Sequence, residues 1–192
     1  MRIALIRAGA TDYDQQGRVQ GTLNIPLCDE GTGEVAQVID EVRPLGLELL
    51  YASGSLAAQQ TAEAIAFNLS IKLKHLEKLH NVDQGLWQGM QIEELKRKHP
   101  KIYRQWEDLC ENVCPPQGET LGEAKDRVQT ALKKILKKNG AAMVGVVAPR
   151  PLFDLFDVSL TSGECGEPFQ VSSAAPGWEL LEPVGHAVPS KV

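Results

Sequence analysis

Apolar residues along the chain recur in two patterns, one typical of buried strands and the other of helices. Strand-length apolar or alternating runs lie at residues 3–7, 47–51, 71–76 and 141–148. Between the first two runs, Val35, Val38, Ile39 and Val42 recur at i, i+3, i+4 and i+7, which marks one face of a helix. This alternation predicts an α/β fold of three layers, α/β/α, with a mostly parallel sheet covered by helices on both faces.

Capping residues place the ends of two longer helices. Ser55 can cap a helix that runs to about Leu69. Thr120 and Glu123 form a capping box, in which each side chain satisfies a free amide of the other residue, and this box opens a helix to Lys138. The remaining expected elements are helices at 91–98 and 101–112, late strands at 169–172 and 178–181, and a long polar loop at 8–31.

Four lysines crowd the end of the helix that starts at Thr120. Lys133, Lys134, Lys137 and Lys138 stand in its last turns, where cations interact favourably with the helix macrodipole. We therefore expect these side chains to be solvated and to stabilise the helix end, and we do not expect them to form a binding patch.

The size and charge of the chain limit the classes of protein to consider. A chain of 192 residues can bury one sizeable core, so we expect a single domain at 1–182 followed by a tail at 183–192. A net charge of −5 argues against binding to nucleic acid or to anionic membranes, which needs a basic face. No apolar stretch approaches the roughly 20 residues of a membrane span.

The cysteines do not indicate a metal centre. Cys110 and Cys114 have the spacing of zinc ligands, but no second pair of Cys or His residues lies near them in the sequence, and Cys28 and Cys165 are remote. We expect reduced, packed thiols in a cytoplasmic protein, and neither a metal ion nor another cofactor.

Several short motifs occur together in a characteristic order. They are Leu-Ile-Arg-Ala-Gly-Ala-Thr-Asp at 5–12, Gly-Arg-Val-Gln-Gly at 17–21, Pro-Leu at 26–27, Gln-Thr-Ala-Glu-Ala-Ile-Ala at 60–66, Gly-Leu-Trp-Gln-Gly at 85–89, Gln-Gly-Glu-Thr at 117–120 and Val-Val-Ala at 146–148. Taken together, this set resembles the histidine phosphatase family, which includes cofactor-dependent phosphoglycerate mutase. The resemblance covers about residues 1–150 and implies a phosphoglycerate mutase-like fold.

The resemblance also implies a set of catalytic positions, and most of them hold the wrong residue for the chemistry. In the family a neutral histidine attacks a phosphoryl group, two arginines and a second histidine bind that group, and a carboxylic acid protonates the leaving oxygen. Here the nucleophile position is Ala8, the second arginine is Ala57, the acid is Asn81 and the second histidine is Pro149. Only Arg7 remains of this set.

A shift of register does not restore the missing histidines. The chain has His75, His80, His99 and His186, so none stands in residues 1–74 or 101–185. His80 is adjacent to position 81, where it would replace the acid and not the nucleophile. The sequence therefore predicts a pseudoenzyme, without phosphohistidine chemistry.

What the resemblance leaves in place is a set of anion-binding residues. It implies that Arg7, Thr11, Arg18, Gln20 and Gly21 contact a phosphorylated or other anionic ligand. The chain can also bind a protein partner or form a homodimer, and the sequence does not decide between these alternatives.

The sequence leaves several alternatives beside this interpretation. Arg7 can instead pair with a carboxylate, Asp12 or Asp83. A phosphatase with a replaced mechanism would use Asp12, Asp14, Asp83 or Cys28, although no spacing favours one of them. A third alternative is a scaffold protein whose pocket has no function.

Three further residues belong to this interpretation. We expect Trp87 and Trp106 to pack in the core or against a cleft wall. Arg150, beside Pro149, stands where its side chain can reach into the pocket.

Overall fold

The computed structural model contains one six-stranded sheet, and it describes residues 1–76, 79–108, 111–140, 142–164 and 168–184. The sheet order is β3-β2-β4-β1-β6-β5. The strands are β1 (Arg2–Arg7), β2 (Leu49–Ser53), β3 (Lys72–Leu76), β4 (Met143–Ala148), β5 (Phe169–Ala175) and β6 (Trp178–Pro183). The pairs β1–β4, β2–β4 and β2–β3 are parallel, whereas β6 pairs antiparallel with β1 and with β5.

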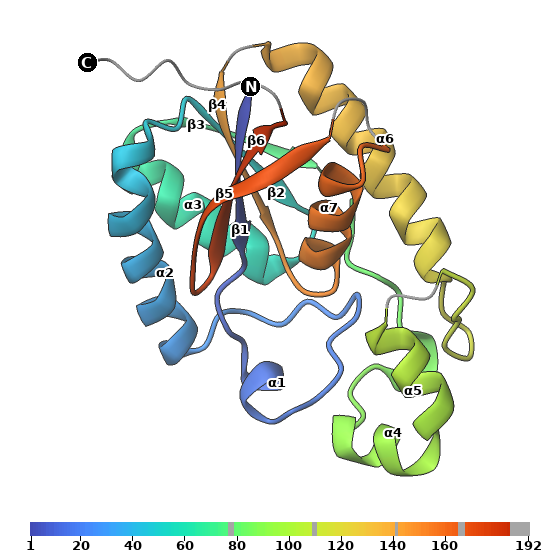
Figure 1. Cartoon of the computed structure of the whole chain (residues 1–192). Coiled ribbons are helices and arrows are strands. Elements are labelled where there is room, and N and C mark those ends of the chain that lie inside the picture. The colour runs from blue at the N-terminus through green and yellow to red at the C-terminus, as the bar shows by residue number, and fades with distance from the viewer. Residues whose placement is uncertain (77–78, 109–110, 141, 165–167, 185–192) are drawn as a thin grey trace.

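Helices cover both faces of the sheet (Figure 1). On one face, α2 (Asp29–Val42) and α3 (Leu56–Leu69) share a buried apolar cluster with β1, β2 and β4. On the other face, α6 (Leu121–Asn139) and α7 (Leu152–Thr161) pack in a second cluster with residues of the same strands. This arrangement confirms the predicted three-layer α/β/α fold with a mostly parallel sheet.

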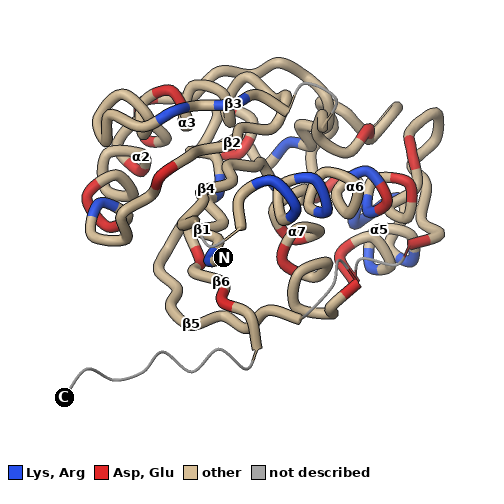
Figure 2. The backbone as a smooth tube through the Cα atoms, turned by 90° about the horizontal axis from the view of Figure 1, so that it is seen from above, with Lys and Arg blue, Asp and Glu red and all other residues tan. Residues whose placement is uncertain are grey.

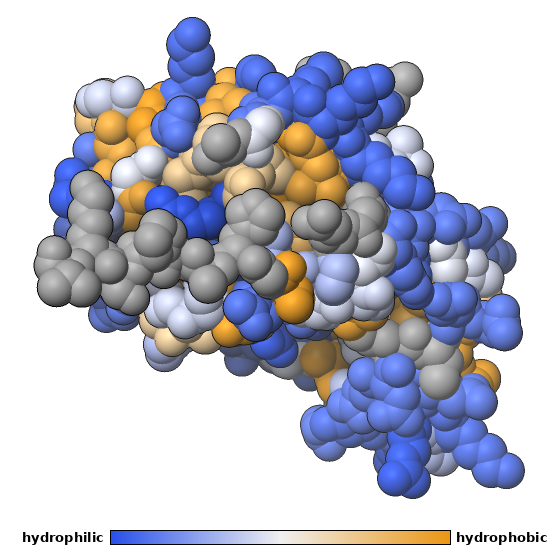
Figure 3. Space-filling view, turned by 45° about the horizontal axis from the view of Figure 1, so that its top comes forward, coloured by the Kyte–Doolittle hydropathy of each residue, from blue (hydrophilic) through white to orange (hydrophobic). Residues whose placement is uncertain are grey.

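A small helical corner lies beside the carboxyl ends of the central strands. It consists of α4 (Ile92–Lys98) and α5 (Pro100–Glu107), which follow the short 3-10 helix η2 (Gly85–Trp87). Trp87, Leu95 and Tyr103 form their own buried cluster there, and partly buried Trp106 packs against it, so both tryptophans pack as expected. On the face shown in Figure 3, the outer side of this corner is mostly hydrophilic.

The predicted boundaries were wrong in the segment that follows β1. We expected a loop over 8–31, but a short helix α1 (Asp12–Gln15) forms there, because Thr11 and Asp14 make a capping box, and α2 already begins at Asp29. The helix α2 ends at Val42, where the 3-10 helix η1 (Arg43–Leu45) contains a proline.

Smaller corrections apply elsewhere. β2 begins at Leu49, two residues later than expected, and α5 ends at Glu107, five residues earlier. The late strands are longer than predicted, and β6 reaches Pro183, which we had assigned to the tail. The strand expected at 141–148 begins at Met143 as β4, and residue 141 lies outside the described residues. Cys110, Cys165 and residues 185–192 of the expected tail lie outside them as well.

None of the helices in the described ranges is both long enough and apolar enough to cross a membrane.

Candidate active site

A pocket of about 190 Å³ opens at the carboxyl ends of the parallel strands. Ligand sites of parallel α/β sheets form at this edge. The lining residues come from the end of β1, from the segment after it that contains α1, from α2, from the start of α3 and from the loop after β4. They are Arg7, Ala8, Gly9, Ala10, Asp14, Gln20, Glu34, Ala57, Pro149 and Arg150. A smaller hollow of about 120 Å³ lies next to it and shares Arg7, Ala8, Gly9 and Glu34.

Three of the positions that the resemblance marks as catalytic line this one pocket. Ala8 follows β1, Ala57 lies in the first turn of α3, and Pro149 follows β4. Arg7, the one residue that matches the family's catalytic set, lines it as well. Segments far apart in the sequence therefore meet at one pocket, as the order of the motifs predicts. Their side chains at these three positions are two methyl groups and a proline ring.

Arg7 is a strand-end arginine whose backbone is fixed and whose guanidinium forms no ion pair with the described residues. Its amide donates to the Gly177 carbonyl oxygen at 2.7 Å. Within the described ranges its side chain forms no ion pair, so the pairing with Asp12 or Asp83 that the sequence left open does not form there. The cation at the pocket wall is thus available to an anion.

Arg150 also lines the pocket, as the sequence left open. Its Nε lies 3.7 Å from Asp154 Oδ1, and 63% of its side chain is exposed. Burial raises the pKa of Asp154, while Arg150 and Arg7 act in the opposite direction. The second cation at the pocket is therefore partly shared with a carboxyl group of α7.

Two carboxylates line the pocket, and backbone amides hold both. Asp14 Oδ2 accepts from the amide of Thr11 at 2.8 Å, and Glu34 Oε2 accepts from the amide of Ala10 at 2.9 Å. Glu34 was missed from the sequence, because it is a polar residue next to the apolar face of its helix and no motif includes it. Each of these carboxylates therefore already uses one of its oxygens to hold the loop after β1.

The other residues considered for a replaced mechanism lie elsewhere. Asp83 Oδ1 accepts from the amide of Gly85 at 2.8 Å, and Cys28 caps α2 and contacts the Ala10 carbonyl oxygen at 3.3 Å. Asp12 is exposed in the first turn of α1. None of these three lines the pocket.

The predicted ligand-binding residues divide into two groups. Gln20 lines the pocket beside Arg7, and its Nε2 is buried with no hydrogen-bond partner in the described part of the chain. Thr11 is used for the cap of α1, and the Arg18 guanidinium donates to the Gly89 carbonyl oxygen at 2.6 Å. Gly21 has a φ of +58°, a conformation that favours glycine, and its carbonyl faces Asn81.

Asn81, at the position of the family's acid, has a structural role. It is 1% exposed, and its Nδ2 donates to the carbonyl oxygens of Gly21 at 3.0 Å and Arg150 at 3.3 Å. Its Oδ1 accepts from the amide of Val82 at 2.9 Å. The side chain therefore ties together the two loops that flank the pocket.

Thr61 makes a similar connection on the other side of the pocket. Its hydroxyl donates to the Ala57 carbonyl oxygen at 2.8 Å and accepts from the amide of Gly9 at 3.1 Å. The loop after β1 is thus fixed to the first turns of α3 by a side chain that is 1% exposed.

The comparison with protein families gives a match to the model of the histidine phosphatase superfamily (branch 1) over residues 3–150. Phosphoserine phosphatase 1 of Hydrogenobacter thermophilus is 26% identical over 148 residues, which are 77% of this chain and 70% of that protein. A probable phosphoglycerate mutase of Salmonella paratyphi B is 28% identical over 137 residues, which are 71% of this chain and 64% of the relative.

Solved structures share the fold at lower identity. A mycobacterial glucosyl-3-phosphoglycerate phosphatase complexed with VO3 superposes with a TM-score of 0.78 at 18% identity, covering 95% of this chain and 97% of that one. YhfR of Bacillus stearothermophilus gives a TM-score of 0.77 at 18% identity, with 95% of each chain covered.

Proposed function

The chain belongs to the histidine phosphatase superfamily (branch 1), and from this premise we propose that it is a non-catalytic member that binds a phosphorylated or other small anion at Arg7. In this proposal the scaffold and one cation of the family's phosphate site serve binding without phosphoryl transfer. Thr11, Arg18 and Gly21 hold the loop, while Arg7 and Gln20 contact the ligand.

The observation that carries this proposal is the side chain at position 8. Ala8 lines the pocket directly after Arg7, at the nucleophile position of the family, and a methyl group cannot attack phosphorus. Removing the nucleophile alone costs about 10⁶ in turnover in a well-studied protease whose anion-stabilising site is intact. Here the pocket has also lost a second arginine and a second histidine.

The donors that remain support weak anion binding. Arg7 has no ion pair within the described ranges, and Gln20 Nε2 is a buried donor without a partner there. A charge-assisted hydrogen bond contributes roughly 1.5–3 kcal/mol. The negative charges of Asp14 and Glu34 repel a bound anion, so we expect dissociation constants in the millimolar range. A dissociation constant of 1 mM corresponds to a binding free energy of about −4 kcal/mol.

An assay with p-nitrophenyl phosphate tests the absence of catalysis. We expect no release of p-nitrophenol above that of the Arg7→Ala protein and no phosphorylated protein intermediate. Turnover that is lost on Asp14→Asn would instead support a phosphatase with a replaced mechanism and overturn the proposal.

Calorimetric titration with inorganic phosphate and 3-phosphoglycerate tests the binding. We expect binding that Arg7→Ala weakens at least tenfold, while Arg2→Ala, at the other end of the same strand, leaves it unchanged. At 100 times the dissociation constant, a ligand stabilises by about 2.7 kcal/mol, which raises Tm by about 5–10 °C. Equal affinities in the two variants, or no binding of either anion, would contradict the proposal.

A further inference from the structure

A second and larger cavity of about 770 Å³ lies away from the candidate active site, between α6 and the strands β2 and β3. We call it the α6–β3 groove, and it is lined by Tyr51, Lys74, His75, Leu76, Leu79, Asp126, Arg127, Thr130, Ala131, Lys134, Ile135 and Lys138. Its α6 wall runs from residue 126 to residue 138, about 18 Å at 1.5 Å per residue. The groove is as large as ligand pockets usually are.

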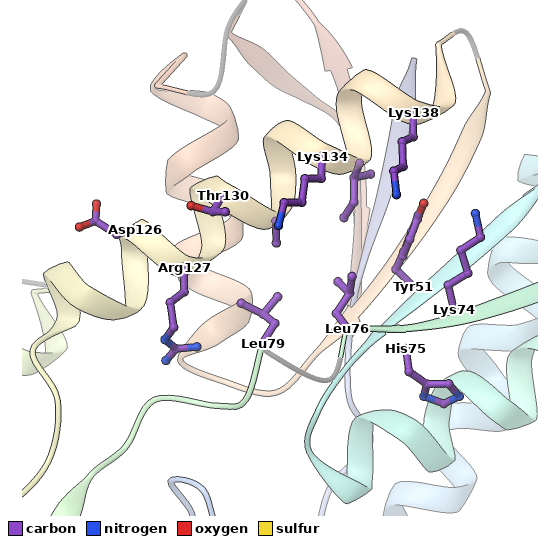
Figure 4. Close-up of a pocket in the computed structure, with 12 residues that line it drawn as sticks. Tyr51, Lys74, His75, Leu76, Leu79, Asp126, Arg127, Thr130, Lys134 and Lys138 are labelled. Carbon is purple, nitrogen blue, oxygen red and sulfur yellow. The ribbon is translucent and has the colours of Figure 1, made fainter.

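Cations dominate the rim of the groove in a chain whose net charge is −5. Lys134 and Lys138 stand one turn apart on α6, and Lys74 comes from β3. Figure 4 shows these three side chains directed toward the cavity around Tyr51, and Asp126 directed away from them. Figure 2 shows the same concentration of Lys and Arg along α6 and on β3.

The three lysines have no acidic partner in the part of the chain that the structure describes. No ion pair joins Lys74, Lys134 or Lys138 to a described carboxylate. The fourth cation, Arg127, is already used, since it pairs with Glu119 and donates to the His80 carbonyl oxygen. Three ammonium groups therefore face one cavity without compensation by those residues.

The floor of the groove is apolar. Leu79 and Ile135 are buried, and Leu76 and Ala131 pack against the same core cluster. The Tyr51 ring forms one wall, and the Lys74 ammonium lies 5.6 Å from the centroid of this ring. The Tyr51 hydroxyl accepts a hydrogen bond from Asn139 Nδ2 at 3.2 Å. A ligand that fits must offer apolar surface to the floor and negative charge to the rim.

A second copy of this chain does not fit that description. β3 is an edge strand, so two copies could pair along it, but this pairing would bring Lys72 and Lys74 of both copies together on one short edge, and in the antiparallel register centred on residue 73 Lys72 would lie opposite Lys74. Like charges directly opposite each other on neighbouring strands are destabilising.

We propose that the α6–β3 groove binds a small amphipathic anion, whose apolar ring or short chain lies on the floor and whose phosphate or carboxylate head lies among Lys74, Lys134 and Lys138. From the sequence, Lys134 and Lys138 are expected to be solvated and to stabilise the end of the helix, and not to form a binding patch. Their exposure agrees with that expectation, but Lys74 and the apolar floor beside them were not foreseeable from the helix alone.

Calorimetric titration with 1-naphthyl phosphate, 1-naphthoate and the neutral 1-naphthylmethanol tests the proposal. The full chain carries Arg7→Ala, which removes the unpaired arginine of the candidate active site, so a failure of that site to bind anions does not affect the result. We expect 1-naphthyl phosphate to bind more tightly than 1-naphthoate, and both to bind at least tenfold more tightly than the alcohol. Raising the NaCl concentration from about 50 to 500 mM should weaken the binding of both anions, because salt screens exposed charges.

Two charge-reversal variants on the same helix provide the decisive comparison. The variant with Lys134→Glu and Lys138→Glu should bind 1-naphthyl phosphate at least tenfold more weakly. Lys133→Glu with Lys137→Glu changes the net charge equally on residues that do not line the groove, and should change the affinity less than threefold. Equal losses in the two variants, or no binding of 1-naphthyl phosphate at millimolar concentration, would overturn the proposal.

Discussion

Asn81 illustrates how one buried side chain can connect two loops at the edge of a pocket. A carboxylic acid at this position has at most one hydrogen atom to donate and a carboxylate has none, whereas the amide of Asn81 donates to the carbonyl oxygens of both Gly21 and Arg150. The loops that flank the pocket are therefore held by a side chain at the position where the resemblance expects an acid.

Asn81→Asp should destabilise the protein by about 2–4 kcal/mol, because it removes a buried donor and places a carboxyl group against carbonyl oxygens. Those oxygens disfavour the ionised form, so the loss should be larger at pH 8 than at pH 5. Urea unfolding at both pH values measures it, with Asn112→Asp at an exposed position as the control. A loss no larger than that of the control would contradict this role.

Three carboxyl groups near the pocket carry raised pKa values. Burial raises the pKa of Asp157 on α7, and the neighbouring Asp154 adds to this effect. Burial also raises the pKa of Glu179 on β6, with contributions from Asp157 and Asp154. A raised folded-state pKa means that the native chain holds its proton longer than the unfolded chain, so stability is lost as pH rises through the folded pKa.

Asp157→Asn should remove one such contribution. The stability of the variant relative to the original protein should increase from about pH 4, the usual carboxyl range, toward pH 7. Thermal unfolding across that range measures the trend, and Asp126→Asn, at an exposed carboxylate of α6, should not reproduce it. A difference that does not change with pH would contradict the assignment.

At the scale of elements, the candidate active site depends on how the loop after β1 is attached to α3. The Thr61 hydroxyl is the connection, since it bonds to the amide of Gly9 and to the carbonyl of Ala57. Both neighbouring residues line the pocket, so its shape follows from this attachment.

Thr61→Val keeps the volume of the side chain but leaves the buried amide of Gly9 without a partner. We expect a loss of about 1–3 kcal/mol and faster hydrogen exchange of the Gly9 amide. Thr32→Val, whose hydroxyl bonds only within α2, provides a comparison. Unchanged exchange at Gly9 would show that the loop is held by other contacts.

Elements with strong patterns were predictable from the sequence, and the groove was not. α3 and α6 begin at their predicted caps, Ser55 and Thr120, because a cap and an apolar face are both local signals. The pocket positions 8, 57 and 149 followed from motif order, although nothing local indicated Glu34. The groove needs Lys74 and Lys134 from distant segments, a proximity that only tertiary packing creates.

At the scale of the whole molecule, the sheet has two free edges, formed by β3 and β5. An exposed edge strand can pair with another chain, and lysines are a common protection against this. Lys72 and Lys74 are both exposed on β3. The homodimer considered from the sequence stays a prediction, and we expect that it does not use this edge.

Lys72→Val with Lys74→Val should therefore cause association that increases with protein concentration, because it removes the repulsion and adds apolar surface to the edge. Sedimentation velocity from about 5 to 200 µM measures it. Lys133→Val with Lys137→Val, on α6, controls for the loss of two charges. A variant whose sedimentation stays identical to that of the original protein would contradict this role of the lysines.

Charge is also distributed unevenly across the sheet. Lys74 lies on β3 at one side of the sheet, and Glu179 lies on β6, four strand spacings away, or about 19 Å, where it interacts with Asp154 and Asp157 of α7. A charged surface would thus attract one end of the molecule and repel the other. Despite a net charge of −5, the chain should adsorb to an anionic resin at low ionic strength with its lysine side facing the matrix.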